Sequence, residues 1–274
     1  MALELTYFGD TRVPVEIEGL TPDWACDKSL AEIARFELFH GNRRLPLAEM
    51  FRITGSANDR RIDLFGDLSG VHWLGAGMAS GEMHVHGSVG RHAGSHMRGG
   101  TLQVQGNAAG WLGTALTGGL IHVRGDAGDL VGAADLGAAR GMTGGTILID
   151  GNAGHEIGRA MRRGVIAIGG TAGDLVGFNM LAGTVLVFGG CGQRAGAGMR
   201  RGTIGILGRT APQLLPTFRH ATALRPQFMA VILRHLRNQG LTIDESLFAT
   251  EFEIYHGDRL ALGRGELLVR RGAI

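Results

Sequence analysis

The sequence repeats one short pattern at a nearly fixed interval, and that interval restricts the fold more than any other feature. Each copy begins with two apolar residues separated by a single position, and glycines follow. Successive copies are 21, 19, 19, 26, 19, 19 and 19 residues apart. The apolar pairs are Ile62/Leu64, Met83/Val85, Leu102/Val104, Ile121/Val123, Ile147/Ile149, Ile166/Ile168, Val185/Val187 and Ile204/Ile206.

A second series of residues keeps the same interval. A large apolar residue, methionine in all but one copy, stands two or three residues before a glycine. Both series lengthen by seven residues at the same point, between Gly132 and Gly141. Because an unbranched thioether adapts to irregular space, we expect this series to form a stack inside the core. Its members are Met78, Met97, Leu116, Met142, Met161, Met180 and Met199.

Alternation of apolar with polar or small residues predicts strands that have one buried face. A 19-residue unit of short strands cannot bury that face alone, so it must stack on copies of itself. We therefore predict a right-handed parallel β-helix of about eight 19-residue coils over residues 62–208. The 48 glycines follow no Gly-X-Y triplet, which excludes collagen, and glycine suits the corners because it accepts positive φ.

The two ends of the chain lack the repeat. Residues 1–61 predict a small α+β cap, in which Ser29 and Glu32 have the spacing of a helix capping box. A strand is expected over residues 13–17, another over 36–39, and a short helix over 45–51. Residues 209–274 predict an amphipathic helix and a tail that pack on the β-helix or on a partner. The apolar stripe of that helix is formed by Phe228, Val231, Ile232, His235 and Leu236.

The outward strand positions change character along the predicted solenoid. The early coils carry polar pairs there, namely His84/His86, Gln103/Gln105 and His122/Arg124. The later coils carry mostly apolar residues, which are Leu148, Ala167, Leu186, Phe188 and Leu207. A solvated face should remain polar, so we expect the later coils to be covered by the C-terminal segment or by another protein. Leu148, Leu186, Phe188 and Leu207 are therefore candidates for a partner interface.

Five arginines lie beside the methionine series, and the repeat predicts that they follow one corner of the solenoid. They are Arg98, Arg162, Arg163, Arg200 and Arg201. Such arginines could bind a polyanionic tail, pair with acidic residues of a partner, or be solvated. We include them among the partner-interface candidates.

Motifs that carry chemistry are scarce. The dinucleotide fingerprint, the phosphate loop, the nucleophile elbow and the His-Glu-x-x-His motif do not occur. His84, His86 and His122 could converge on a metal, or could form a solvated or partner-facing cluster. Cys191 lies in a glycine-rich turn, and the sequence identifies no base beside it. We therefore assign no catalytic, cofactor-binding or metal-binding residue to this chain.

Acidic and amide side chains occur next to the turn glycines. A calcium β-roll would need them in a nonapeptide rhythm, so we expect them to accept hydrogen bonds from turn amides. They are Asp67, Asn107, Asp126, Asn152 and Asp174.

Charge and cysteine content exclude several classes of protein. The net charge of +2 is too small to indicate a nucleic-acid partner. Cys26 and Cys191 are too few for a disulfide framework, which favours a reducing, cytoplasmic compartment. No 18-residue apolar stretch occurs, so we expect no contact with a membrane.

The repeated glycine pattern resembles the Gly-x-Gly-x-Gly β-helix domain of glutamate synthase large subunits and the C subunit of formylmethanofuran dehydrogenase. The likeness to the C subunit is the broader one, because it includes segments at both ends of the chain and the insertion before Gly141. These segments are Leu20-Thr21-Pro22-Asp23, Gly41-Asn42, Leu47-Ala48-Glu49-Met50-Phe51, Gly141-Met142-Thr143-Gly144-Gly145, Gly257-Asp258 and Gly263-Arg264-Gly265-Glu266.

This resemblance implies a non-catalytic structural subunit that holds active subunits together. In the bacterial formyltransferase/hydrolase complex, those are an amidohydrolase-like A subunit, a B subunit and a formyltransferase D subunit. That complex moves a formyl group from tetrahydromethanopterin to a methanofuran analogue and hydrolyses it to formate, and the partner subunits bind both coenzymes. The arginine-rich composition favours the bacterial complex. Three alternatives stay open: an archaeal molybdenum or tungsten formylmethanofuran dehydrogenase, a β-helical acyltransferase, and a glutamate-synthase-like spacer domain.

Overall fold

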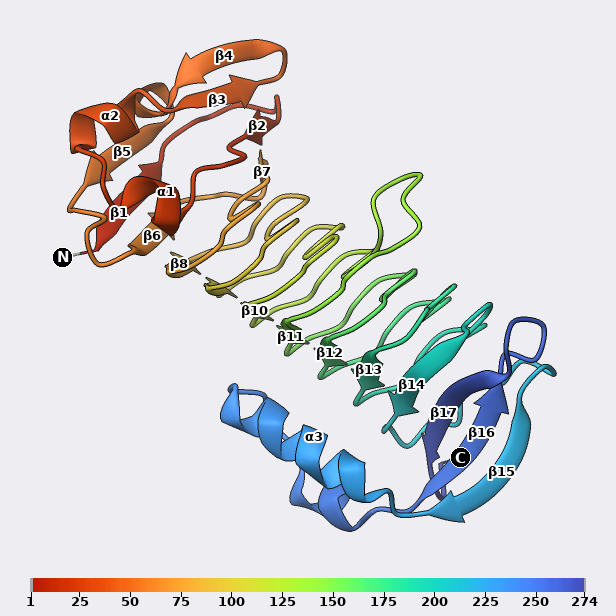
Figure 1. Ribbon diagram of the computed structural model, residues 1–274. Coiled ribbons are helices and arrows are strands. Elements are labelled where there is room, and N and C mark those ends of the chain that lie inside the picture. The colour runs from red at the N-terminus through yellow and green to blue at the C-terminus, as the bar shows by residue number, and fades with distance from the viewer. Residues whose placement is uncertain (1, 274) are drawn as a thin grey trace.

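The computed structural model describes residues 2–273, and most of its regular structure is β (Figure 1). One 13-stranded sheet runs the length of the molecule, and its neighbouring strands are parallel from β1 through β14 to β17. The strands at its two ends, β5, β16 and β15, pair antiparallel. In sheet order the strands are β5 (Phe51–Thr54), β1 (Leu3–Tyr7), β6 (Arg61–Phe65), β8 (Glu82–Val85), β9 (Thr101–Val104), β10 (Leu120–Val123), β11 (Thr146–Ile149), β12 (Val165–Ile168), β13 (Thr184–Val187), β14 (Arg201–Ile206), β17 (Arg264–Arg270), β16 (Phe252–Gly257) and β15 (Arg219–Leu224).

The repeat sets the register of this sheet. Ile121 lies opposite Leu102 on one neighbouring strand and Ile147 on the other, so equivalent positions of successive copies stack. All sixteen residues of the apolar pairs are fully buried, and so are all members of the methionine series. The prediction that both series point into the core is confirmed, and the chain has the β-helix-like fold that the repeat indicates.

A second column of parallel bridges runs beside the sheet. It joins successive coils one residue at a time, through Leu68, Val89, Ala108, Ala127, Ala153, Ala172 and Cys191. Small side chains allow the coils to approach closely there. At the turn before β9, Gly100 has φ +77°, and a Cβ at that position would lie 2.6 Å from the carbonyl oxygen of Gly81. Only glycine fits that corner.

Acidic and amide side chains connect the turns of successive coils, as expected. The Asn107 side-chain oxygen accepts a hydrogen bond from the Asp126 amide at 2.8 Å, and Asp126 accepts one from the Asn152 amide at 2.6 Å. Asn152 and Asp174 accept in the same way from Thr171 and Gln193. Asp67 bonds the amide of Ser69 within its own turn.

The N-terminal segment extends the sheet and adds a second, smaller one. The smaller sheet has the order β4 (Arg43–Pro46), β3 (Glu37–His40), β2 (Val15–Glu16), β7 (Val71–His72), so it bonds directly to the first coil. Two short helices, α1 (Pro22–Ala25) and α2 (Leu30–Ala34), precede β3.

The capping box predicted at the start of α2 is confirmed, because the Ser29 and Glu32 side chains each bond the other's backbone amide. The helix predicted over residues 45–51 is wrong. Only the 3-10 turn η1 (Leu47–Glu49) forms there, because residues on both sides of it are used by the strands β4 and β5.

The C-terminal segment covers one half of the sheet and continues it. Helix α3 (Gln227–Asn238) runs along the outer face of the later strands in Figure 1, and a 3-10 helix η2 (Glu245–Ala249) follows it. The helix begins after Pro226 and ends before Gly240, as predicted. The predicted stripe is wrong except at Leu236 and the half-buried Ile232, because Phe228, Val231 and His235 are exposed. The side that packs on the sheet carries Met229, Leu233 and Leu236 instead. Strand β17 then pairs with β14 in the register of another coil. The sheet therefore continues across both expected boundaries, residues 61/62 and 208/209.

Candidate functional site

The apolar outward residues of the later coils lie beneath α3. Leu148 and Leu186 are fully buried and Leu207 is 1% exposed, in a cluster with Met229 and Leu233 of the helix. Phe188 is half-buried at the edge of this cluster. Of the two coverings expected, the C-terminal segment of the same chain is the one present. The expectation that Leu148, Leu186 and Leu207 meet a partner is therefore wrong, because α3 and the rest of the cluster already remove their side chains from water. Phe188 is only half-buried and stays a candidate for the partner interface.

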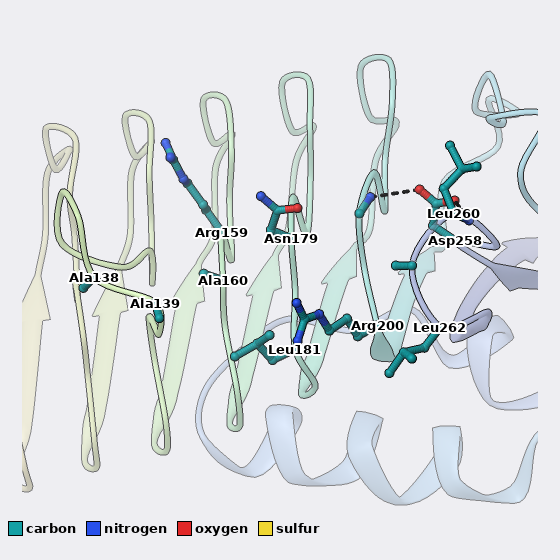
Figure 2. Close-up of a pocket in the computed structure, with 12 residues that line it drawn as sticks. Ala138, Ala139, Arg159, Ala160, Asn179, Leu181, Arg200, Asp258, Leu260 and Leu262 are labelled. Atoms are coloured by element: carbon teal, nitrogen blue, oxygen red, sulfur yellow. Dashed lines mark hydrogen bonds between the residues drawn. The ribbon is translucent and has the colours of Figure 1, made fainter.

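The arginine-rich corner carries a long groove between two loops (Figure 2). One loop is the insertion between Gly132 and Gly141, here called the insertion loop, and the other is residues 258–263, here called the C-terminal loop. Two adjoining hollows of about 940 Å³ and 480 Å³ make up the groove, and they share Ala139, Leu181, Arg200 and Leu262. We call this surface the arginine groove. It is lined by Ala138, Ala139, Arg140, Arg159, Ala160, Arg162, Asn179, Leu181, Gly198, Arg200, Arg201, Asp258, Leu260, Ala261 and Leu262.

The structure separates the five arginines that the repeat places on one corner. Arg162, Arg200 and Arg201 line the arginine groove. Arg98 lies in a different hollow of about 410 Å³, three coils closer to the N-terminus, because the intervening coils carry Thr117 and Thr143 at the equivalent position. Arg163 is exposed and lines neither hollow.

Asp258 closes one end of the groove and completes the last coil. In earlier coils the equivalent backbone amides bond a carbonyl of the next coil, as Asn179 does with Ala197. Gly198 lies in the last coil, and its amide instead donates to the Asp258 carboxylate at 3.0 Å (Figure 2). Burial raises the pKa of Asp258, but hydrogen bonds from the amides of Leu260 and Gly198 outweigh it and leave the pKa below its usual range. Asp258 therefore serves the fold as a carboxylate cap.

The groove is strongly basic. Among the described residues that line it, Asp258 contributes the one carboxylate, and backbone amides occupy that group. Arg159 pairs with Glu156 at 2.9 Å. Within residues 2–273 no ion pair forms at Arg140, Arg162, Arg200 or Arg201. Guanidinium groups that form no ion pair within the described chain are suited to bidentate contacts with carboxylates or other oxyanions.

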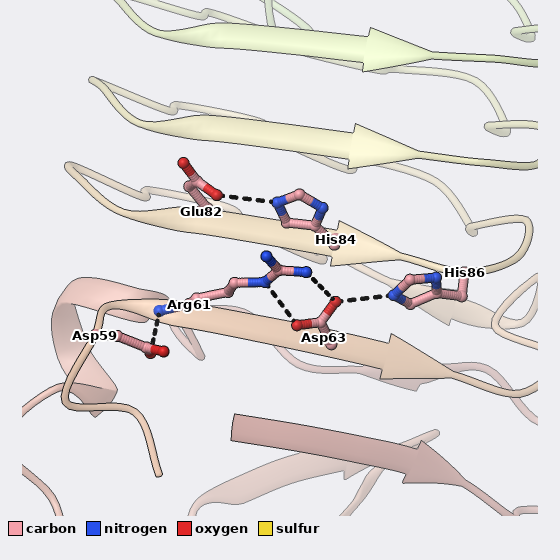
Figure 3. A network of polar contacts seen from close by, with 6 residues as sticks. All are labelled: Asp59, Arg61, Asp63, Glu82, His84 and His86. Atoms are coloured by element: carbon pink, nitrogen blue, oxygen red, sulfur yellow. Dashed lines mark hydrogen bonds and ion pairs between the residues drawn. The ribbon is translucent and has the colours of Figure 1, made fainter. Parts of the chain in front are cut away.

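A polar network occupies the outer face of the sheet at the opposite end of the rod (Figure 3). The Asp63 carboxylate is 6% exposed and accepts hydrogen bonds from Arg61 at 2.8 and 3.0 Å. His86 contacts the same carboxylate at 2.8 Å and stacks on the ring of Phe65. Burial raises the pKa of Asp63, yet the Arg61 and His86 hydrogen bonds outweigh it and hold the pKa below its usual range.

The three outward histidines do not converge. His84 contacts Glu82 at 3.1 Å, His86 contacts Asp63, and His122 contacts Asp150 at 2.8 Å. Each imidazole thus has its own carboxylate. Across residues 2–273 no group of three or more His, Cys, Asp or Glu side chains is arranged to hold a metal ion.

Burial raises the pKa of the Cys191 thiol to about 11, so the thiolate needed for nucleophilic attack does not form near neutral pH. This cysteine instead occupies the last position in the second column of bridges.

One aromatic cluster was missed by the sequence reasoning, although its members are 19 residues apart. The rings of Trp73, His92 and Trp111 stack on three successive coils, with centroids 4.1 and 5.5 Å apart. Burial between the rings lowers the pKa of His92, so a neutral imidazole is favoured. The stack is a packing feature on a corner distinct from the arginine groove.

Sequence reasoning also missed the C-terminal side of the groove. Leu260 and Leu262 are 85% and 55% exposed, and they follow Asp258 directly. The sequence signal that could have identified them is a pair of leucines at alternate positions in a glycine-rich turn, where exposed residues are usually polar. Arg140 and Arg159 were missed because they lie outside the columns next to the methionine series.

Comparison with solved structures gives a likeness over almost the whole chain. A chain of the formyltransferase/hydrolase complex (FhcABCD) from Methylorubrum extorquens, crystallised with methylofuran, is 34% identical and has a TM-score of 0.90. The match covers 97% of this chain and 98% of that one.

Curated relatives match over shorter stretches. The C subunit of a molybdenum-containing formylmethanofuran dehydrogenase from Methanothermobacter marburgensis is 39% identical over 95 residues, which is 34% of this chain and 24% of that protein. The C subunit of a tungsten-containing formylmethanofuran dehydrogenase from Methanothermobacter thermautotrophicus is 38% identical over 87 residues, or 30% and 32% of the two chains. The matches thus span about a quarter to a third of these relatives. No family model matches the chain. None of the helices between residues 2 and 273 has the length and apolar character that a membrane crossing needs.

Proposed function

The chain belongs to the family of formylmethanofuran dehydrogenase C subunits, and we propose that it is the non-catalytic structural subunit of a formyltransferase/hydrolase complex. The observation that carries the proposal is the end-to-end likeness, at 34% identity, to a chain of the Methylorubrum complex. A likeness over 97% of the chain includes both termini as well as the coils, so it involves the surfaces that would meet partners.

In this role the chain holds together three other subunits. They are an amidohydrolase-like A subunit, a B subunit and a formyltransferase D subunit. Together they transfer a formyl group from tetrahydromethanopterin to a methanofuran analogue and hydrolyse it to formate. Both coenzymes are bound by the partner subunits, and this chain supplies a rigid surface between them. The methylofuran in the related crystal structure supports the choice of coenzyme.

The architecture suits this role because the rod is closed at both ends. Residues 1–61 act as a cap on the first coil, and residues 209–274 close the last coil and cover the apolar half of the sheet. The solenoid between these two segments has about eight coils over residues 62–208. Because both of its ends are covered, it can associate through its sides without polymerising end to end. Arg162, Arg200 and Arg201 in the arginine groove provide the partner contact on one side.

Co-expression of this chain with the three partner subunits tests the proposal. We expect one assembly containing all four chains by size-exclusion chromatography and native mass spectrometry. Omission of this chain should divide the assembly into smaller complexes and should abolish coupled conversion of formyl-tetrahydromethanopterin to formate. The isolated chain serves as the control and should show no turnover. A chain that elutes alone in the presence of all three partners contradicts the proposal.

A second candidate is the C subunit of a molybdenum or tungsten formylmethanofuran dehydrogenase. The 38–39% identity to such subunits over about a third of this chain favours it. Metal analysis of the native complex separates the two functions. Molybdenum or tungsten in stoichiometric amounts would indicate the dehydrogenase, and formyl transfer with hydrolysis in a complex that contains neither metal would indicate the first candidate.

A further inference from the structure

The arginine groove has the chemistry of a site for a particular kind of protein segment. It is basic along its floor and apolar at its sides. A solvated surface needs no exposed apolar side chains, and neither does a site that binds a small anion. Leu260 and Leu262 are exposed on the C-terminal loop and line the groove, and Leu136, which is 83% exposed, lies on the insertion loop outside the lining. Leu181 lies half-buried on the floor between the two loops (Figure 2). Exposed leucines grouped around a hollow indicate a surface that another chain covers.

The spacing of the arginines restricts the shape of that segment. Arg162, Leu181 and Arg200 occupy the same position of three successive coils. Coils stack about 4.8 Å apart, so the two arginines start roughly 10 Å from each other along the rod. An extended chain advances about 3.3 Å per residue. Side chains of an extended segment alternate between two sides, so positions i, i+2 and i+4 face the groove together and span about 13 Å. Carboxylates about four residues apart therefore match the two guanidinium groups, because the long arginine side chains cover the remaining distance. An apolar side chain midway between the carboxylates would then contact Leu181.

We propose that the arginine groove binds an extended acidic segment of a partner subunit, with carboxylates about four residues apart and an apolar residue midway between them. This inference rests on the proposed role as a structural subunit. It goes further by assigning one surface and the chemistry of its occupant. The leucines favour a protein segment over a purely anionic chain, because a chain of carboxylates alone would leave Leu260 and Leu262 in water.

Photo-crosslinking within the assembled complex identifies the occupant. Leu262 is replaced by p-benzoylphenylalanine, the four subunits are co-expressed, and crosslinked peptides are sequenced by mass spectrometry. We expect one partner peptide that carries at least two Asp or Glu residues about four positions apart and an apolar residue midway between them. A crosslink to a coenzyme, to a nucleic acid or to a peptide without this pattern overturns the proposal, and so does the absence of any crosslink in an intact complex. If no complex assembles, the proposed function fails instead, so the two failures are distinguishable.

Charge reversal measures the contribution of the arginines. The double variant Arg162→Glu, Arg200→Glu should weaken association with the crosslinked partner by roughly tenfold to 100-fold at physiological salt. The matched control Arg98→Glu, Arg163→Glu changes the same charges outside the groove and should have an effect of less than about threefold. A milder pair, Arg162→Gln and Arg200→Gln, covers the case in which the reversed variant does not fold. Equal effects of the groove and control pairs overturn the proposal.

Discussion

The outer face of the long sheet is polar over its first coils, which α3 does not cross and which we call the open half. It is apolar over its later coils, which α3 covers and which we call the covered half. A single ladder position shows the change: Asp63, His84, Gln103 and His122 stand in register with Leu148, Ala167, Leu186 and Gly205. The two halves have the same backbone and the same buried core. The difference lies in whether α3 crosses them, and α3 crosses where the outward side chains are apolar.

The comparison shows that the inward and outward side chains of one strand determine different features of the fold. The inward face is uniform and specifies the coil, whereas the outward face specifies which coils need a cover. At position 205 the sequence even provides space for that cover, because a Cβ on Gly205 would lie 2.7 Å from the Leu186 side chain and 3.7 Å from Met229 of α3. The helix can therefore approach the sheet closely at this point.

The largest expected effect is on the covered half. Leu186→Ala removes a fully buried side chain between the sheet and α3, and we expect the free energy of unfolding to fall by about 2–5 kcal/mol. Gln103→Ala, at the equivalent position on the open half, should change it by less than about 0.5 kcal/mol. Chemical denaturation of both variants makes the comparison. Equal losses at the two positions would mean that α3 is not the cover in solution.

The next effect in size is on the open half. Asp63→Asn removes the charge that Arg61 and His86 share, and we expect a loss of about 1–3 kcal/mol at pH 7. The folded-state pKa of Asp63 lies below the unfolded value of about 3.9. Its stabilisation is therefore present above the unfolded pKa and is lost as the pH falls through the folded pKa.

Denaturation at a series of pH values checks this sign. The difference between wild type and Asp63→Asn should shrink as the pH falls below about pH 4. Glu82→Gln is the control, because its carboxylate is 57% exposed and pairs only with His84. It should cost no more than about 0.5 kcal/mol at any pH. A difference for Asp63→Asn that grows as the pH falls below about pH 4 would contradict the lowered pKa of Asp63.

A smaller effect on the free energy of unfolding is expected at the border between the covered and open halves of the sheet, where α3 ends. Helix α3 ends there at Asn238, shortly before Gly240, which has φ +99°. Arg124, which follows strand β10, donates a hydrogen bond to the Gly240 carbonyl. Gly240→Ala places a side chain in a left-handed conformation and should cost roughly 1 kcal/mol. Gly70→Ala adds a Cβ in open space without positive φ and serves as the control. If both variants have the stability of the wild type, the end of α3 is not held at this border.

Much of the fold could be predicted because the 19-residue interval leaves few alternatives. Two independent series agreed on the interval and on the insertion, and the capping box at Ser29 and the helical period after Pro226 gave the two main helical segments outside the repeat. The period located α3 but did not identify its buried side, which carries Met229, Leu233 and Leu236. The strands β1 and β15 were missed. Neither belongs to the repeat, and neither has a partner nearby in the sequence, since β1 pairs with β5 and β6, and β15 pairs with β16.

The site was less predictable, because it depends on residues from different parts of the chain. The repeat placed Arg162 and Arg200 on one corner correctly, but it could not show that the C-terminal loop returns to that corner. It also could not show that Asp258 replaces the missing next coil for Gly198. Both facts follow from how the last 66 residues fold back on the rod, and no periodicity describes those residues.

The smallest expected effect tests where the cover itself ends. Val231 lies on the side of α3 that faces away from the sheet and is 64% exposed, unlike Leu233, which is fully buried two residues later. Val231→Ala removes a β-branched side chain from an exposed helix position, so the isolated chain should gain up to about 0.5 kcal/mol of stability through helix propensity. Thermal unfolding measures this gain, with Leu233→Ala as the opposite case, for which a loss of about 2–5 kcal/mol is expected. A loss of more than about 1 kcal/mol at Val231 would mean that α3 is buried on both sides. The outer side of the helix would then also be covered, and α3 would not be the outermost layer over the later coils.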